Sequence, residues 1–343
     1  MARSHLSLLA GLAFTAIAGA QTTKTFTYPV GGTSRSFVAH VPSGISQPAL
    51  VFFVHGYGGS GSGFENDTKG DAVADREKFI AVYPSAVGGS WSMYDTTDYP
   101  FLLSIVDTVD AHWKIDRRRV YCAGFSQGGF ISHGLGYKHP GTFAAVAPVS
   151  GHMPSFSTTA PLPRAVPTFI TFGTNDVSDV ASFMADLAIW KRLDTCTSSP
   201  VQQRPYPSTR PKSVVSRTTW SCAHGSEVVI DSVIGGGHEW AMDTTSHVNT
   251  TEEVWAFFKR FTRDGTTSIL PHPVGRETLR ASWVGGALRL EGIGTHERVR
   301  ILDARGKQVQ AGWVEEGRLD CGPLAPGLYS ARGSAGMATF VVP

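Results

Sequence analysis

Short, fully apolar runs alternate along this chain with longer segments that have the period of a helix. The first run, residues 49–54, reads Ala-Leu-Val-Phe-Phe-Val, which is typical of a strand buried on both faces. Comparable runs follow at 79–83, 119–123, 143–148, 168–172 and 228–234, and helical candidates lie between or after them at 101–112, 128–138, 180–193 and 250–261. This alternation predicts an α/β fold with a mostly parallel sheet and helices on both faces.

The two ends of this region carry more local signals. Residues 23–41 alternate apolar and polar positions on either side of Gly31-Gly32, which predicts a β-hairpin. In the last helical candidate, Thr250 and Glu253 have the spacing of a capping box. Its expected core-facing stripe consists of Val254, Phe257, Phe258 and Phe261.

The composition changes after Phe261. Residues 262–277 contain Gly, Pro, Ser and Thr without periodicity and are expected to form a linker. Residues 278–343 show short alternating segments, which predict a small all-β sandwich module of about 65 residues, near the lower limit for independent folding. The expected organisation is therefore a main domain at 21–261, a linker and a small C-terminal module.

One short segment, Gly124-Phe125-Ser126-Gln127-Gly128, has the form G-x-S-x-G. The pattern alone is weak in so glycine-rich a chain, but its surroundings strengthen it. An apolar strand precedes it and a helical candidate follows from Gly128, and a nucleophile elbow has this strand–turn–helix order. The segment therefore predicts that Ser126 is a nucleophile held out from the end of a strand.

A serine hydroxyl needs a base, and the base needs an acid that orients it. Asp176 follows the run 168–172, and His238 follows the run 228–234 through three glycines, so the chain offers the order Ser, Asp, His. Asp179 competes with Asp176 in the same loop, and we favour Asp176 because it is nearer the strand end. Ser126, Asp176 and His238 are thus the predicted catalytic residues.

Two backbone N–H groups should stabilise an oxyanion in such a site. One is expected from Gln127, the residue after the nucleophile, and the other from Tyr57 in the glycine-rich loop after the run 49–54. His55 in that loop could be a base or a metal ligand, but we favour a structural role that holds the loop. No other metal-spaced cluster accompanies it, so neither a metal nor an organic cofactor is expected.

The N-terminus resembles a secretory signal. Arg3 precedes an apolar stretch at 6–17, and Ala18-Gly19-Ala20 provides small residues before a predicted cleavage at Gln21. A buried helix is the alternative, but the stretch has no amphipathic period. No other stretch is apolar enough to cross a membrane, so we expect an exported, secreted protein without a membrane span.

Export makes the cysteines informative. Cys196 and Cys222 bracket a Ser/Pro/Arg-rich loop that a disulfide would close, whereas Cys122 is expected to be a buried free thiol and Cys321 to be unpaired. A disulfide between Cys122 and Cys321 is the alternative that stays open. The net charge of +2 and the lack of a long basic run do not indicate nucleic acid or an acidic membrane as a partner.

The same residues resemble a known group of enzymes. The segments 54–60, 90–101, 115–129 and 236–240 are similar to those of extracellular polyhydroxybutyrate-depolymerase-like esterases, which include the feruloyl and acetylxylan esterases of carbohydrate-esterase family one. The resemblance implies an α/β-hydrolase fold and the Ser126-Asp176-His238 triad. It also suggests pocket walls formed by Trp91 and Trp240, for which ordinary packing is an equal alternative. It also matches the pair Cys196 and Cys222.

The resemblance leads to a substrate hypothesis. It implies a serine esterase that acts on esters of plant cell-wall polysaccharide, feruloyl first and acetyl second, with a polyhydroxyalkanoate depolymerase as the alternative within the fold. A noncatalytic surface-binding protein on a hydrolase scaffold is the alternative from another class. Thr97 and Ala241 depart from the group's pattern at positions that concern the substrate rim rather than the triad.

The C-terminal module has a resemblance of its own. The segments 299–307 and 324–329 are similar to the β-sandwich sorting domains of bacteria that export enzymes through a dedicated outer-membrane route. Contact with secretion machinery is therefore expected, but the chain lacks the basic terminal residue of such domains and ends in Val341-Val342-Pro343. An accessory role that contacts carbohydrate, or a spacer role, stays open.

Overall fold

The computed structural model describes two compact units, Met1–Leu270 and Pro271–Pro343. The described residues are 21–93, 97–154, 158, 160–242 and 248–266 in the first unit, and 280–284, 287–291, 298–303, 307–315, 318–319, 322–333 and 336–342 in the second. The predicted signal peptide at 1–20, residues 267–277 of the predicted linker, and Cys321 lie outside the described residues.

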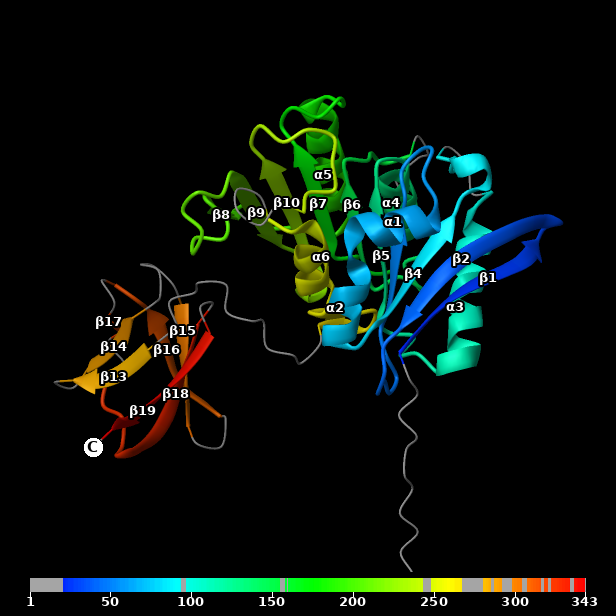
Figure 1. Ribbon diagram of the computed structural model, residues 1–343. Helices are drawn as coiled ribbons and strands as arrows, with labels where there is room; N and C mark the ends of the chain where they lie inside the picture. Colours follow the sequence, from blue (N-terminus) through cyan, green and yellow to red (C-terminus); the bar gives the residue numbers. More distant parts are fainter. Residues whose placement is uncertain are drawn as a thin grey trace, which may run out of the picture. The chain divides into compact units, whose positions relative to one another are not determined.

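A ten-stranded sheet with the order β1-β2-β4-β3-β5-β6-β7-β10-β9-β8 forms the centre of the first unit (Figure 1). Neighbours from β4 to β10 in this order are parallel, and the outer strands are antiparallel. The predicted α/β-hydrolase fold with a mostly parallel sheet is confirmed. The strands are β1 (Thr22–Val30), β2 (Thr33–Val41), β3 (Leu50–Val54), β4 (Ile80–Ser85), β5 (Val120–Phe125), β6 (Ala145–Val149), β7 (Thr168–Gly173), β8 (Val201–Gln203), β9 (Val215–Ser221) and β10 (Glu227–Val233).

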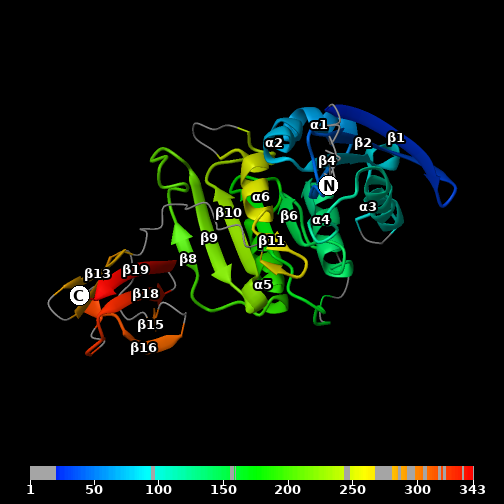
Figure 2. The ribbon, with the colours of Figure 1, turned by 90° about the horizontal axis from the view of Figure 1, so that it is seen from below.

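Helices cover both faces of this sheet (Figure 2). Because side chains alternate across a strand, Phe52 of β3 belongs to the core under one layer of helices and Phe53 to the core under the other. The first layer contains α3 (Tyr99–Trp113), α4 (Gln127–Lys138) and α5 (Val180–Leu193). The second contains α1 (Gly61–Thr68), α2 (Gly70–Glu77) and α6 (Thr250–Phe258).

The sequence patterns missed α1 and α2. Both are short, and α1 buries a single large apolar side chain, Phe64, so neither has the apolar stripe that reveals a helix. Ser60 was an available signal, because its hydroxyl accepts a hydrogen bond from the Gly63 N–H at 3.1 Å and caps α1. Lys69, with φ of 53°, turns the chain from α1 into α2.

Helix α6 differs from its prediction at both ends. The side chain of Asn249, not that of Thr250, accepts the N-terminal hydrogen bond, from the Glu252 N–H at 3.1 Å. The predicted capping box is therefore wrong, because Thr250 is already inside the helix and its hydroxyl is buried. The helix ends at Phe258, and Phe261 lies in a hairpin of β11 (Phe261–Thr262) and β12 (Gly265–Thr266), which includes the first residues of the predicted linker.

The segment between Cys196 and Cys222 was expected to be an irregular loop. It instead contains β8 and β9, which pair with each other and extend the sheet beyond β10. The disulfide between the two cysteines is present, and Cys122 is a buried free thiol, as predicted. None of the helices in the described part of the chain has the length and apolar character needed to cross a membrane.

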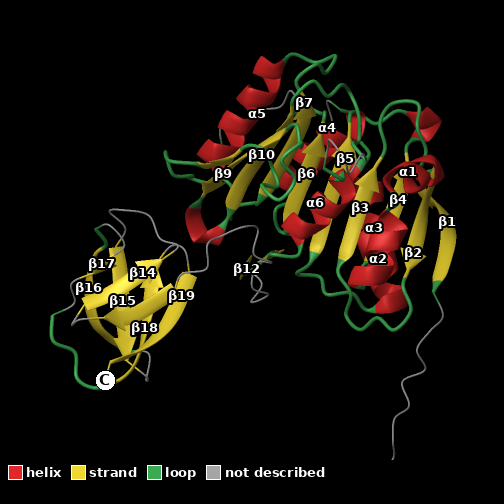
Figure 3. Cartoon of the chain, turned by 60° about the vertical axis from the view of Figure 1, so that its left-hand side comes forward, coloured by secondary structure: helices red, strands yellow, loops and turns green. Residues whose placement is uncertain are grey.

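The second unit consists of two antiparallel sheets, β13-β14-β17 and β16-β15-β18-β19, in agreement with the predicted all-β module (Figure 3). Its small core includes Leu288, Ile301 and Phe340. The strands are β13 (Arg280–Val284), β14 (Ala287–Glu291), β15 (Arg298–Asp303), β16 (Gln308–Trp313), β17 (Arg318–Leu319), β18 (Gly327–Gly333) and β19 (Gly336–Val342).

We predict that the Cys196→Ser/Cys222→Ser double variant loses about 3 kcal/mol of unfolding free energy, because the bridge closes a loop whose ends are 26 residues apart. Guanidinium unfolding followed by tryptophan fluorescence measures this loss. Reductant should lower the midpoint of the wild type toward that of the variant and leave the variant unchanged. Equal midpoints for both proteins under oxidising conditions would contradict the prediction.

Candidate active site

The predicted site residues all follow parallel strands of the central sheet. The carboxyl ends of such strands meet at one edge, toward which their arrowheads point in Figure 3. Ser126 follows β5, Asp176 follows β7, His238 follows β10, and the loop with Tyr57 follows β3. The fold thus brings these segments to the same edge.

Ser126 lies at a sharp turn between β5 and α4. Its backbone has φ of 54° and ψ of −118°, which is strained for a residue with a side chain. Hydrogen bonds on both sides of the residue stabilise this backbone conformation. The Ser126 N–H donates to the Val149 carbonyl at 2.9 Å, and the Ser126 carbonyl accepts from the Gly129 N–H at 2.8 Å. This is the geometry of a nucleophile elbow.

The glycines around Ser126 are required by close main-chain packing. A Cβ atom on Gly124 would lie 2.0 Å from the Gly128 carbonyl oxygen, and one on Gly128 would lie 2.0 Å from the Val54 carbonyl oxygen. Gly151, which the sequence analysis did not single out, would carry a Cβ 2.4 Å from the Ser126 carbonyl oxygen. A signal for it was the pair Ser150-Gly151, which follows one residue after the predicted strand 143–148.

Asp176 and His238 are brought together across 62 residues of sequence. The Nδ1 atom of His238 lies 2.9 Å from Oδ1 of Asp176, whose side chain is fully buried. A carboxylate only accepts, so this contact places the proton on Nδ1 and leaves Nε2 as the basic nitrogen. The His238 ring packs beside the Phe125 ring, with centroids 4.9 Å apart, and therefore lies next to the elbow.

The loops that carry the acid and the histidine pack tightly on each other. The Asn175 N–H donates to the Gly236 carbonyl at 2.8 Å, and a Cβ atom on Gly173 would lie 2.2 Å from the same oxygen. Gly235 has φ of 78°, a conformation that favours glycine, and so it begins the turn that carries His238. The glycine run before His238 thus allows both a tight turn and the close approach of its loop to the loop that carries Asp176.

Asp179, the alternative acid, has a different partner. Its side chain accepts a hydrogen bond from the Ala181 N–H at 3.1 Å and caps α5. It is exposed, whereas Asp176 is held at its strand end by a hydrogen bond from its own N–H to the Gly173 carbonyl at 3.0 Å. The structure therefore pairs His238 with Asp176, the favoured candidate.

Of the two predicted oxyanion donors, one follows Ser126 in the chain and the other follows a residue that adjoins Ser126. Gln127 is the first residue of α4, where N–H groups have no acceptor within the helix. Tyr57 follows Gly56, whose added Cβ atom would lie 3.1 Å from Cβ of Ser126, so the loop after β3 passes directly against the nucleophile. The loop after β3 and the start of α4 thus both adjoin the nucleophile, and the donor roles of the two amides stay a prediction.

His55 holds this loop, as predicted. Its Nε2 accepts a hydrogen bond from the Ala86 N–H at 3.0 Å, so its Nδ1 carries the proton and donates to the Gly56 carbonyl at 2.6 Å. Burial lowers the pKa of His55, which favours the neutral ring that this arrangement needs. His55 thus joins the loop after β3 to the loop after β4.

Trp91 and Trp240 are both buried, as the packing alternative expects. Trp91 is 3% exposed and donates its ring N–H to the His55 carbonyl at 2.9 Å. Trp240 is 9% exposed, packs in the core against Phe53 and Phe64, and donates to the Thr251 hydroxyl at 2.9 Å. Both side chains therefore have packing contacts, and a role of either as a pocket wall stays a prediction.

Two side chains outside the predicted set also organise the site. The Gln127 side-chain oxygen accepts from the Trp91 N–H at 3.0 Å, which ties the residue after the nucleophile to the loop after β4. Buried Asp98 accepts from the Ser92 N–H at 2.7 Å and from the Arg35 guanidinium at 2.6 Å. The sequence did not point to Arg35, because an arginine in an alternating strand is usually exposed and nothing in the neighbouring residues shows that this one is buried.

Comparison with known proteins agrees with this architecture. Residues 49–224 match the family described as the alpha/beta hydrolase fold. The chain belongs to this α/β hydrolase family. Among solved structures, an acetyl xylan esterase from Aspergillus awamori has the same fold, with a TM-score of 0.53 at 17% identity over 63% of this chain and 94% of that chain.

Two curated relatives of this α/β hydrolase are enzymes that act on esters by name. A bifunctional acetylxylan esterase/xylanase of Neocallimastix patriciarum is 26% identical over 261 residues, 74% of this chain and 37% of that protein. A feruloyl esterase B of Neurospora crassa is 28% identical over 156 residues, 42% of this chain and 53% of that protein. The aligned regions thus span about a third and about half of these relatives.

We predict that Gly128→Ala lowers the unfolding free energy by about 2–3 kcal/mol, because the new methyl group overlaps the Val54 carbonyl. The matched control is Gly237→Ala in the histidine loop, where an added Cβ has no atom within 4 Å. This control should stay within about 0.5 kcal/mol of the wild type in chemical unfolding. Equal stability of the two variants would refute the packing argument.

Proposed function

We propose that this α/β hydrolase is a serine carboxylic-ester hydrolase with Ser126 as nucleophile, His238 as base and Asp176 as the residue that orients it. The observation that carries the proposal is the 2.9 Å contact between His238 and buried Asp176 at the edge where Ser126 is held in a strained turn. A noncatalytic scaffold would have no need to maintain backbone strain together with a histidine that is hydrogen-bonded to a buried carboxylate.

The proposed reaction has two stages. Nε2 of His238 accepts the Ser126 proton while Oγ attacks the ester carbonyl, and the N–H groups of Tyr57 and Gln127 stabilise the oxyanion. Collapse of this intermediate breaks the ester bond, and the alcohol leaves with the proton held by His238. Water then attacks the acyl-enzyme in the same way and releases the acid and free Ser126.

We further propose esters attached to plant polysaccharide as substrates, with feruloyl preferred over acetyl. Support comes from apolar side chains that remain exposed next to the site residues. Tyr57 is 75% exposed, and Val177, which follows Asp176, is 86% exposed. Val87, in the turn Val87–Gly89, is 52% exposed, and the Gly89 carbonyl accepts from the Gly58 N–H at 2.8 Å.

An aromatic acyl group would cover the exposed side chains of Tyr57, Val87 and Val177, whereas an acetyl group is too small to reach them. The names of the two relatives, an acetylxylan esterase/xylanase and a feruloyl esterase, agree with a polysaccharide ester as substrate. A water-insoluble polyester would also cover apolar side chains, so the polyhydroxyalkanoate depolymerase remains the alternative to be tested.

We also propose that the protein acts after export. The disulfide between Cys196 and Cys222 supports this, because such bonds persist in oxidising compartments outside the cytosol. The signal-like segment 1–20 agrees with it. The same proposal includes a role of the C-terminal module in directing the protein to the secretion machinery.

We predict that Ser126→Ala reduces kcat on a chromogenic acetate ester by about 10⁴-fold or more, because no other group can form the acyl-enzyme. Asp176→Asn should lose about 10⁴-fold, because the amide favours the wrong tautomer of His238. Asp179→Asn, a matched change in the same loop, should keep kcat within about threefold. An inactive wild type would refute the catalytic proposal and favour a noncatalytic binding protein.

The substrate proposal has its own test. Tyr57→Ala and Val177→Ala should each lower kcat/KM for methyl ferulate by about 10-fold through lost apolar contact, and change that for an acetate ester by less than about twofold. Val201→Ala is the control, because Val201 is 62% exposed but lies on the edge strand β8. Clearing of polyhydroxybutyrate without release of ferulate from arabinoxylan would favour the depolymerase instead.

A further inference from the structure

The second unit exposes an aromatic and basic sheet face that the proposed reaction does not use. Trp313 on β16 is 62% exposed, the largest apolar side chain so exposed among the described residues. Val299 and Ile301 of the neighbouring strand β15 are fully buried in the core of the unit. Because side chains alternate along a strand, Arg300 between them lies on the opposite, outer face, where it is exposed.

Strand pairing places Trp313 on this outer face. Arg300 pairs with Ala311 of β16, and Trp313 lies two residues further along the same strand. Diagonal neighbours on one face of a sheet are about 7–8 Å apart, within reach of aromatic and long side chains. The indole of Trp313 and the guanidinium of Arg300 are therefore close enough to contact one ligand.

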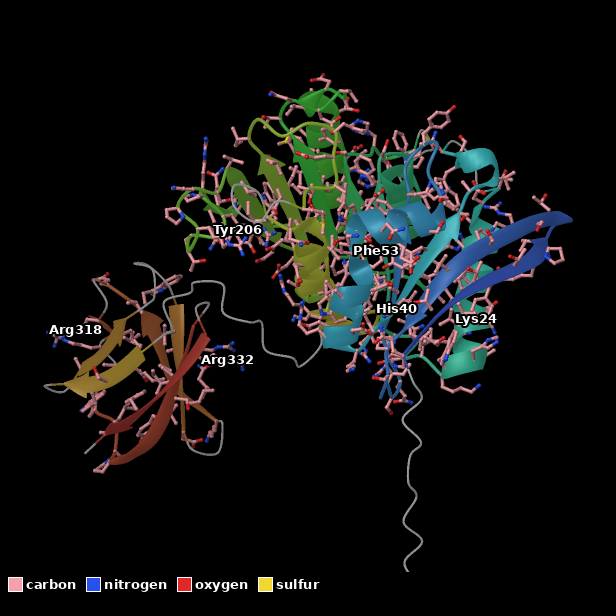
Figure 4. The ribbon with its side chains drawn as sticks, viewed as in Figure 1. Lys24, His40, Phe53, Tyr206, Arg318 and Arg332 are labelled. Atoms are coloured by element: carbon pink, nitrogen blue, oxygen red, sulfur yellow. A yellow bond between two sulfur atoms is a disulfide. The ribbon has the colours of Figure 1, made fainter. Side chains whose placement is uncertain are left out.

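A second arginine extends the basic surface. Arg332 of β18 is directly opposite Arg300 in the register and is also exposed, and Figure 4 shows its side chain at the surface of the unit. Like charges directly opposite each other repel and destabilise a sheet unless a counter-charge lies between them. Three paired rows share this face, and the residues in them whose side chains the structure describes include no carboxylate: Trp313; Ala311, Arg300 and Arg332; Gln308, Leu302 and Ser330.

We propose that this face, defined by Trp313, Arg300 and Arg332, binds a polysaccharide that carries uronic acid groups. An exposed indole on a sheet face offers a stacking plane for a sugar ring. The planar guanidinium groups match a carboxylate in geometry and charge, and the ligand would supply the missing counter-charge. The choice of a polysaccharide rests on the proposed function, since a bound polymer would keep the first unit near its ester substrates.

The test uses the full-length chain with Ser126→Ala, so that no ester is cleaved during the measurement. The probe is polygalacturonate in affinity gel electrophoresis, and its highly methyl-esterified form is the neutral control. We expect retardation by polygalacturonate alone. Trp313→Ala and Arg300→Gln/Arg332→Gln should each weaken this binding at least tenfold, and the loss from the arginine variant should shrink as salt is added.

The unit offers a matched control for charge. Arg289 of β14 and Arg318 of β17 are also paired in register and exposed. They belong to the other sheet, and the residues described beside them include no exposed aromatic side chain. Figure 4 shows Arg318 and Arg332 on different sides of the unit. Arg289→Gln/Arg318→Gln removes the same charge and should leave binding within about twofold of the parent.

Several outcomes would overturn the proposal. These are no binding to polygalacturonate, equal loss in both arginine variants, an unaffected Trp313→Ala variant, or binding to vesicles of anionic phospholipid in place of polygalacturonate. The proposed function is tested by a different measurement, the hydrolysis of a soluble chromogenic ester, so its failure can be distinguished from a failure to bind polygalacturonate. In a chain with native Ser126, Trp313→Ala should not change that hydrolysis.

Discussion

The close main-chain contact among β3, β5 and the first turn of α4 is the constraint on which the site depends. Gly124 and Gly128 leave no room for a methyl group at the places where their backbones meet neighbouring carbonyls. This contact lets α4 begin directly after Ser126 and forces the serine into its strained conformation. The same contact therefore exposes the nucleophile and places the N–H of Gln127 beside it.

A polar network around the elbow keeps the loops in position. His55 joins the loops after β3 and β4 through its two ring nitrogens, and the Gln127 side chain reaches the Trp91 amide. Asp98 and Arg35 fix the far end of the second loop. These hydrogen bonds, at 2.6–3.0 Å, hold the loops in place although they are not part of the sheet, while the Nε atom of Arg35 is buried without a hydrogen-bond partner among the described residues.

The predictions from sequence succeeded where a signal was local. The apolar runs predicted the central strands, because a strand buried on both faces is apolar throughout. The helical period of apolar residues predicted α3, α4 and α5. They failed where structure depends on distant partners. Strands β8 and β9 have no apolar pattern of their own and exist because β10 offers them an edge, and α1 and α2 are short helices that pack on the sheet with few apolar residues.

By itself the sequence determined the α/β class, the elbow segment and the chain order of Ser126, Asp176 and His238, because these depend on neighbours in the chain. Only the tertiary structure decided that His238 pairs with Asp176 while Asp179 caps a helix. It also showed that Trp91 and Trp240 are buried and packed, and it placed Trp313 and two arginines on one sheet face. Which side chains meet depends on strand order and register, and no single segment of sequence encodes these.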